Sequence, residues 1–251
     1  QLAKDIPSLD IYDESEPSAD ELQSRALSAE EAARAVPGIT NSEGGSASHG
    51  SVEVMLATSN GFSGQYKRSS FGISAMVLSE KNGVMERDYD YTAAVYDEDL
   101  KDPTEIGRRA GERTMERLGA ISPTTGAYPV IYDNRVSSSI ASHIASAING
   151  AAIARGTSFL KDMMGQAIAS SSITMIDDPL RESGIGSSPF EGEGRPRQRR
   201  IKVEGGVLKG WFLDLVSAKQ LGLDPTGNAG RGIGTTASPA TSNWIMQPGE
   251  T

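Results

Sequence analysis

The sequence predicts an α+β protein, in which an antiparallel β-meander with flanking helices is followed by part of a β-rich C-terminal domain. Helical and strand-like segments follow one another without regular βαβ alternation, which favours this class over a parallel α/β fold. Three strand-like segments within residues 52–91 are separated by short turns, as in a meander. The 28 glycines in 251 residues indicate many turns rather than a helical bundle.

The N-terminal segment is helical in character. Ser18 and Glu21 have the spacing of a capping box, and Ser28 and Glu31 repeat it. Pro37-Gly38 is expected to stop the helix. Residues 41–50 are rich in Gly and Ser and are expected to form a polar connection.

The expected meander has three strands. The first covers residues 52–56 and leads to the turn signal Asn60-Gly61. The second, residues 71–78, is apolar and reads as a buried strand. The turn at residues 81–83 leads into the third strand, residues 84–91.

Two further helices are predicted. The first begins with Asp102 as N-cap and Pro103 in its first turn, and it is expected to end near Gly119. Residues 128–132 are expected to form a short buried strand. Asp133 or Asn134 then caps a second helix that is expected to end near Gly156.

The C-terminal half alternates short elements with polar loops. A strand is expected at residues 173–176, a polar loop at 181–200, and a hairpin from residues 201–203 and 207–216. The predicted domain limits are residues 1–45 for an acidic helical segment, 46–120 for a central α+β domain, and 121–251 for the first part of a C-terminal domain.

Composition excludes several classes of protein. The net charge is −9, and residues 1–50 hold ten acidic and three basic side chains, so no basic domain for nucleic acid is present. The absence of cysteine excludes disulfides, cysteine zinc sites and a cysteine nucleophile. No apolar run of membrane-spanning length and no signal peptide are seen, so a cytoplasmic location is expected. Because the chain begins at Gln1, we expect the natural N-terminus to lie upstream.

The two histidines are the first candidates for chemistry, and neither has a second histidine at helical spacing. His49 lies in the expected polar connection, where solvation is the simplest role. His143 lies on the predicted helix as a packed or surface-bonded side chain, with a catalytic or ligating role left open. Ser158 and Lys161 match S-x-x-K, but the companion motifs are absent, so chance explains the match.

A glycine cluster at residues 226–234 could cradle an anion through backbone N–H groups, but it lacks nucleotide-binding spacing. A peptide-contacting loop is the preferred interpretation. The residues assigned to it are Thr226, Gly227, Gly230 and Gly232.

Charged residues supply two weaker candidates. The basic run within residues 195–202 could bind phosphates, but a solvated loop paired with Glu191, Glu193 and Glu204 is the simpler interpretation. Asp177 and Asp178 are adjacent on a predicted strand, so their side chains are expected to face opposite sides, which is a poor arrangement for an acid–base pair.

Several segments together resemble the PmbA/TldD family, whose members were once labelled modulators of DNA gyrase. No single segment is specific, but the set follows the family's order from about residue 20 to the end. In chain order the segments are residues 60–64, 85–91, 106–107, 129–131, 188–190, 193–194, 206–208, 217–222 and 226–227.

The resemblance implies a comparison with the family's metal motif, H-E-x-x-x-H on a helix, whose histidines bind the catalytic metal. With Arg155-Gly156 aligned to the family's arginine-glycine, the motif falls on residues 141–146. Ala141, Ser142 and Ser146 then replace the first ligand, the glutamate and the last ligand, and His143 falls between ligand positions. The cysteine ligand of TldD-like chains is also absent.

This departure implies a PmbA/TldE-type chain, shortened at both ends. The expected function is that of the non-metal-binding subunit of a TldD/TldE-like heterodimeric metalloprotease that degrades unfolded or leader peptides. No metal is expected in this chain, and zinc is expected in a TldD-like partner. A homodimer is the alternative assembly. The alternative functions are an independent peptidase with an unrecognised site and a binding module that regulates gyrase or nucleic acid.

Overall fold

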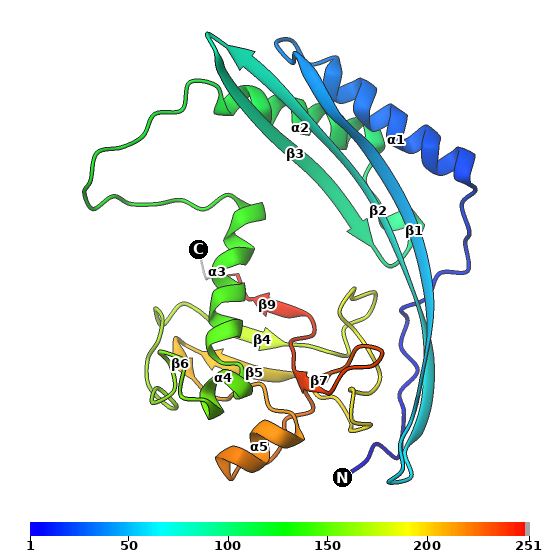
Figure 1. The fold of residues 1–251 in the computed structure, drawn as a ribbon, viewed down its shortest axis with the longest axis vertical. Coiled ribbons are helices and arrows are strands. Elements are labelled where there is room, and N and C mark those ends of the chain that lie inside the picture. The colour runs from blue at the N-terminus through cyan, green and yellow to red at the C-terminus, as the bar shows by residue number, and fades with distance from the viewer. Residues whose placement is uncertain (249–251) are drawn as a thin grey trace. The chain divides into compact units, whose positions relative to one another are not determined.

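The structure is a computed structural model that describes residues 1–248, and its class is α+β, as the sequence predicts (Figure 1). The chain divides into two compact units. The central unit consists of Ile11–Val52 and Lys67–Pro129, and the C-terminal unit consists of Gln1–Asp10, Glu53–Tyr66 and the chain from Val130 onward. No helix among the described residues is long and apolar enough to cross a membrane.

A three-stranded meander runs through the central unit. Its strands are β1 (Asn41–Ala57), β2 (Ser63–Lys81) and β3 (Val84–Ala94), hydrogen-bonded in the order β1-β2-β3. The register of β2 against β3 is antiparallel, from Phe71 opposite Ala94 to Lys81 opposite Val84. The predicted meander is therefore confirmed.

The start of β1 corrects the sequence analysis, because residues 41–50 belong to this strand and do not form a loop. Their small side chains allow the strand to lie against a helix: a Cβ on Gly45 would lie 2.0 Å from the carbonyl oxygen of Ala26. His49 is consequently not a solvated linker residue, since its ring stacks on Phe71 at 4.7 Å between centroids.

Two helices, α1 (Ala19–Arg34) and α2 (Pro103–Arg117), pack against one another and against this sheet. Figure 1 shows both on the same side of the sheet. Ser18 and Glu21 form the predicted capping box of α1, and Asp102 caps α2 as predicted. The core between helices and sheet is built from small and β-branched residues: Ala29, Ala33, Ile73, Ala75, Val77 and Ala110.

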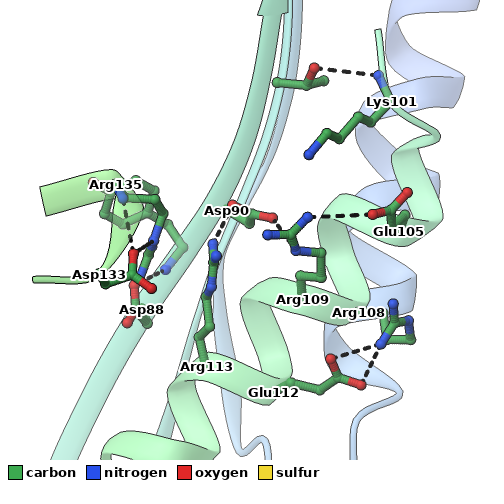
Figure 2. Close-up of polar contacts among 12 residues, drawn as sticks. Asp88, Asp90, Lys101, Glu105, Arg108, Arg109, Glu112, Arg113, Asp133 and Arg135 are labelled. Atoms are coloured by element: carbon green, nitrogen blue, oxygen red, sulfur yellow. Dashed lines mark hydrogen bonds and ion pairs between the residues drawn. The ribbon is translucent and has the colours of Figure 1, made fainter. Parts of the chain in front are cut away.

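A buried carboxylate fixes α2 to β3 (Figure 2). Asp90 is 4% exposed and forms ion pairs with Arg109 and Arg113 from successive turns of α2. The Nε atom of Arg109 lies 3.1 Å from Oδ2 of Asp90. Further out, Arg108 and Glu112 pair at 2.6 Å on the solvent side of the helix. The buried group thus has two charge partners, as a buried charge requires.

The C-terminal unit contains a small antiparallel sheet of four strands in the order β6-β5-β4-β9. A second pair, β7 with β8, forms a hairpin. The remaining elements are three helices and, in the central unit, a short 3₁₀ turn. The bounds are β4 Met175–Asp177, β5 Arg200–Glu204, β6 Val207–Leu208, β7 Ala229–Gly230, β8 Ser238–Pro239, β9 Trp244–Met246, α3 Asn134–Ala147, α4 Gly150–Ala154, α5 Leu215–Leu221 and η1 Asp97–Asp99.

Three expectations for this half of the chain are wrong. Residues 128–132 form no strand and are exposed, with Ile131 97% accessible. The segment 215–216 belongs to helix α5, because Asp214 and Ser217 form a capping box and outweigh the β-branched pattern. The single predicted helix is divided into α3 and α4, where Asn149 caps the second.

Candidate functional site

Helix α3 carries residues 141–146, the positions that the sequence resemblance aligns with the metal motif. The Asp133 side chain accepts a hydrogen bond from the backbone N–H of Arg135, and this cap starts the helix. Ala141 and Ala145 face the core of the C-terminal unit, each 9% exposed. The indole Nε1 of Trp244 on β9 donates to the carbonyl oxygen of Ala141 at 2.8 Å. The helix is thereby tied to the edge strand of the sheet at the first motif position.

A pocket of about 570 Å³ opens beside this position. None of its lining residues is charged, and its surface combines apolar side chains with serine hydroxyls. Such a lining suits a neutral or apolar group and offers no acid or base. The lining residues are Tyr132, Ser137, Ser138, Ile140, Ala141, Ser142, Ser242, Trp244 and Met246.

The motif positions do not fit a metal ion. Ala141 has no donor atom, and the exposed Ser142 and Ser146 carry hydroxyls, which are poor zinc ligands. His143 is exposed on the same helix. Within residues 1–248, no group of three or more His, Cys, Asp or Glu side chains could hold a metal. We therefore derive no metal-dependent step from this chain.

The sheet beneath the site contains a buried carboxylate that the sequence analysis had set aside. Asp177 on β4 is 1% exposed. Its Oδ1 accepts from the backbone N–H and the hydroxyl of Ser242, both at 2.8 Å, and its Oδ2 accepts from Nδ2 of Asn228 at 2.7 Å. Asp178 lies apart from this network and pairs with Arg199 at 3.5 Å. The two acids do not form an acid–base pair.

Lys202 on β5 is buried beside this carboxylate, and this corrects its assignment to a solvated loop. It is 1% exposed, and it ranks first by volume among the fully buried side chains of the described residues. Its Nζ donates to the carbonyl oxygen of Trp211 at 2.8 Å and to Oδ1 of Asn228 at 3.2 Å. Burial lowers the pKa of Lys202 to about 7, although the negative charge of Asp177 opposes the shift.

A second buried acid lies in the loop of residues 190–197. Glu191 is 1% exposed, and its Oε1 accepts from the backbone N–H of Arg195 at 2.8 Å. Burial raises the pKa of Glu191 to about 7. The aromatic rings of Phe62 and Tyr66 pack edge-on against Phe190 at 5.0 and 5.2 Å between centroids. The loop is therefore held by the hydrogen bond to Glu191 and by ring contacts with Phe62, in the β1–β2 turn, and Tyr66, on β2.

The remaining candidates lie in separate places. Thr226 and Gly227 precede β7, Gly230 ends β7, and Gly232 lies in the connection between β7 and β8. The Thr226 hydroxyl donates to Oδ1 of Asn228 at 2.7 Å. The Ser158 hydroxyl donates to the carbonyl oxygen of Ala147 and is buried, so the S-x-x-K match carries no nucleophile. In the basic run, Arg200 donates to the carbonyl oxygen of Thr226, and Arg199 forms an ion pair with Asp178.

The sequence analysis missed the Asp177–Asn228–Lys202 cluster, whose members are far apart in the chain. One signal was available. Lys202 stands between Ile201 and Val203 in a segment predicted as a strand. Because side chains of a strand alternate between the two faces of a sheet, Lys202 lies on the face opposite its two neighbours, and that face can also be buried.

Comparison with known proteins gives a consistent family. The PmbA/TldA metallopeptidase central domain matches residues 12–118, and the C-terminal domain of the same family matches residues 125–251. The chain is 38% identical over 231 residues to the metalloprotease PmbA of Escherichia coli O157:H7, covering 91% of this chain and 51% of that protein. It is 27% identical over 210 residues to a TldD homologue of Buchnera aphidicola, covering 79% of this chain and 44% of that protein.

A solved structure supports the fold. A candidate modulator of DNA gyrase from Bacteroides thetaiotaomicron superposes with a TM-score of 0.88 at 29% identity, covering 99% of this chain and 55% of that one. The chain spans about half the length of the curated relatives that it matches.

Proposed function

Because the chain belongs to the PmbA/TldD family of metallopeptidases, we propose that it serves as the subunit without a metal in a TldD/TldE-like heterodimer that degrades unfolded or leader peptides. One observation carries the proposal. In the alignment that the resemblance implies, Ala141 and Ser146 replace the family's two histidine ligands and Ser142 replaces its glutamate, so neither a good ligand nor the catalytic glutamate remains on this helix.

The surroundings of the motif support the same role. The pocket beside Ala141 has no charged lining residue, so it lacks the general acid and base that peptide hydrolysis needs. Zinc and the catalytic base would come from a TldD-like partner. This chain would shape peptide access and stabilise the active subunit.

The gyrase or nucleic-acid alternative has less support. It depends on the basic run at residues 195–202, where Lys202 is buried and Arg199 and Arg200 are engaged. An independent peptidase would need a nucleophile or base in a pocket. Ser158, the serine of the S-x-x-K match, is 7% exposed and donates to a backbone carbonyl oxygen.

Peptide cleavage in a reconstituted pair tests the proposal. An unstructured peptide is incubated with this chain, with a TldD-like subunit, and with both, each with and without a chelator. We expect cleavage with the pair, its loss with chelator, and zinc bound to the TldD-like subunit alone. The His143→Ala variant should support cleavage as the parent does. Chelator-resistant cleavage by this chain alone, or stoichiometric zinc in it, would overturn the proposal.

A further inference from the structure

The β7–β8 hairpin is held at its base by one buried carboxylate. Asn228 precedes β7 and Ser242 follows β8, and both donate to Asp177. The two ends also meet through the backbone, because the Ala240 N–H donates to the Asn228 carbonyl oxygen at 2.7 Å. The connecting residues 231–236 are exposed. The position of the hairpin therefore depends on the bonds made by Asp177 and Asn228.

Lys202 reaches the same base through Asn228. The Asn228 amide lies between the two ionisable groups: its Oδ1 accepts from Lys202 and its Nδ2 donates to Asp177. An ammonium group has three donors, and Lys202 has two hydrogen-bond acceptors, with the ring of Phe212 4.7 Å from Nζ. The positive charge is thus balanced by Asp177 through a neutral side chain rather than by direct contact.

Two charged groups act on this lysine, and a third acts on Asp177. Asp177 on β4 favours the ammonium form, and Arg200 on β5 disfavours it. Arg197, in the loop before β5, faces Asp177 and competes for its charge. Because the cluster is buried, small changes in any of these charges act strongly on the protonation of Lys202.

We propose that Lys202 controls the β7–β8 hairpin by gaining and losing a proton. The ammonium form is a strong donor to Asn228 and compensates Asp177, so the hairpin base is held. The neutral amine is a weaker donor and leaves the Asp177 charge without this compensation. The bonds through Asn228 then weaken and the hairpin loosens. The change falls near neutrality, since burial brings the pKa of Lys202 to about 7.

The effect extends in two directions. The hairpin carries Gly230 and Gly232, two of the residues assigned to peptide contact, and Ile233 is fully exposed near its tip. Ser242 leads directly into β9, whose Trp244 bonds the carbonyl oxygen of Ala141. Protonation of Lys202 therefore affects both the β7–β8 hairpin and the pocket beside Ala141. This inference stands whether or not the chain pairs with a metal-bearing subunit.

Intrinsic tryptophan fluorescence tests the inference, because the chain has two tryptophans and both belong to this region. Trp211 accepts from Lys202, and Trp244 follows Ser242. A titration from pH 5.5 to 9 should show a transition near pH 7. Lys202→Met should abolish it. Asp177→Asn should move the midpoint down and Arg200→Gln should move it up, because these charges act on Lys202 in opposite directions.

Two variants serve as controls for other ionisable side chains in the same unit. Glu191→Gln and His143→Ala should leave the midpoint unchanged. Hydrogen exchange at residues 228–242, corrected for the intrinsic pH dependence, should show less protection above the midpoint in the parent and in these two variants, but no such change in Lys202→Met. A transition that persists in Lys202→Met, or midpoints that do not move in Asp177→Asn and Arg200→Gln, would overturn the inference. The last two variants keep it testable if Lys202→Met does not fold.

Discussion

The close crossing of α1 and α2 gives the sharpest test of packing, through Gly107→Ala. A Cβ at Gly107 would lie 1.9 Å from the carbonyl oxygen of Ala29 and 2.9 Å from the backbone N of Ala33. These are backbone atoms of α1, which cannot rotate away. Restoring ordinary contact requires the helices to separate locally by roughly 1.5 Å.

Two effects of opposite sign determine how much Gly107→Ala changes the free energy of unfolding. Helix propensity alone favours alanine over glycine by about 1 kcal/mol in α2. Overpacking typically costs about 1–3 kcal/mol, and the cost here lies at the upper end because the clash is with backbone. We expect the free energy of unfolding to fall by a net amount of about 1–2 kcal/mol. For a unit of this size, that corresponds to a fall in Tm of roughly 5–15 °C.

Thermal unfolding followed by circular dichroism measures this change, with urea unfolding as an independent estimate. Glu116→Ala is the matched control, because Glu116 is exposed on the same helix. It should leave Tm nearly unchanged. If Gly107→Ala proved as stable as the parent, or gained the propensity energy, the close contact of the two helices would be refuted.

Two further predictions concern buried acids. Asp90→Asn should lower the free energy of unfolding by about 2–3 kcal/mol, because it leaves Arg109 and Arg113 without their shared charge. Glu112→Gln, in the exposed ion pair with Arg108, should lower it by less than about 1 kcal/mol. Equal losses in urea unfolding would contradict this prediction. The folded-state pKa of Glu191 is raised from 4.5 to about 7, so its contribution to stability is complete below pH 4.5 and is lost as the pH rises to 7. Glu191→Gln should therefore lose less stability than the parent between pH 5 and pH 8, and parallel pH profiles would rule out this role.

Local signals in the sequence predicted much of the fold. Ser18, Glu21 and Asp102 marked helix starts correctly, since capping is decided within one turn. The turn signals at Asn60-Gly61 and at residues 81–83 placed the meander. These features depend on neighbours in sequence, which is why they could be read directly.

The wrong predictions concern segments whose structure depends on residues far away in the sequence. Residues 41–50 resemble a loop in composition, but Gly45 is required to be small by the backbone of α1. The segment 128–132 has a strand-like composition and finds no strand partner among the described residues. Lys202 looked like one of several surface cations. Its burial depends on Asn228 and Asp177, which local pattern cannot bring together.

The interleaving of the two units has a consequence for how the chain folds. The turn between β1 and β2 belongs to the C-terminal unit, while the strands on either side continue into the central unit. Phe62 and Phe190 must meet across more than a hundred residues, so the C-terminal unit cannot complete its core until both stretches have been made. During synthesis, the β1–β2 turn can pack only after the loop of residues 190–197 has emerged. No single cut in the chain separates one unit from the other with both intact.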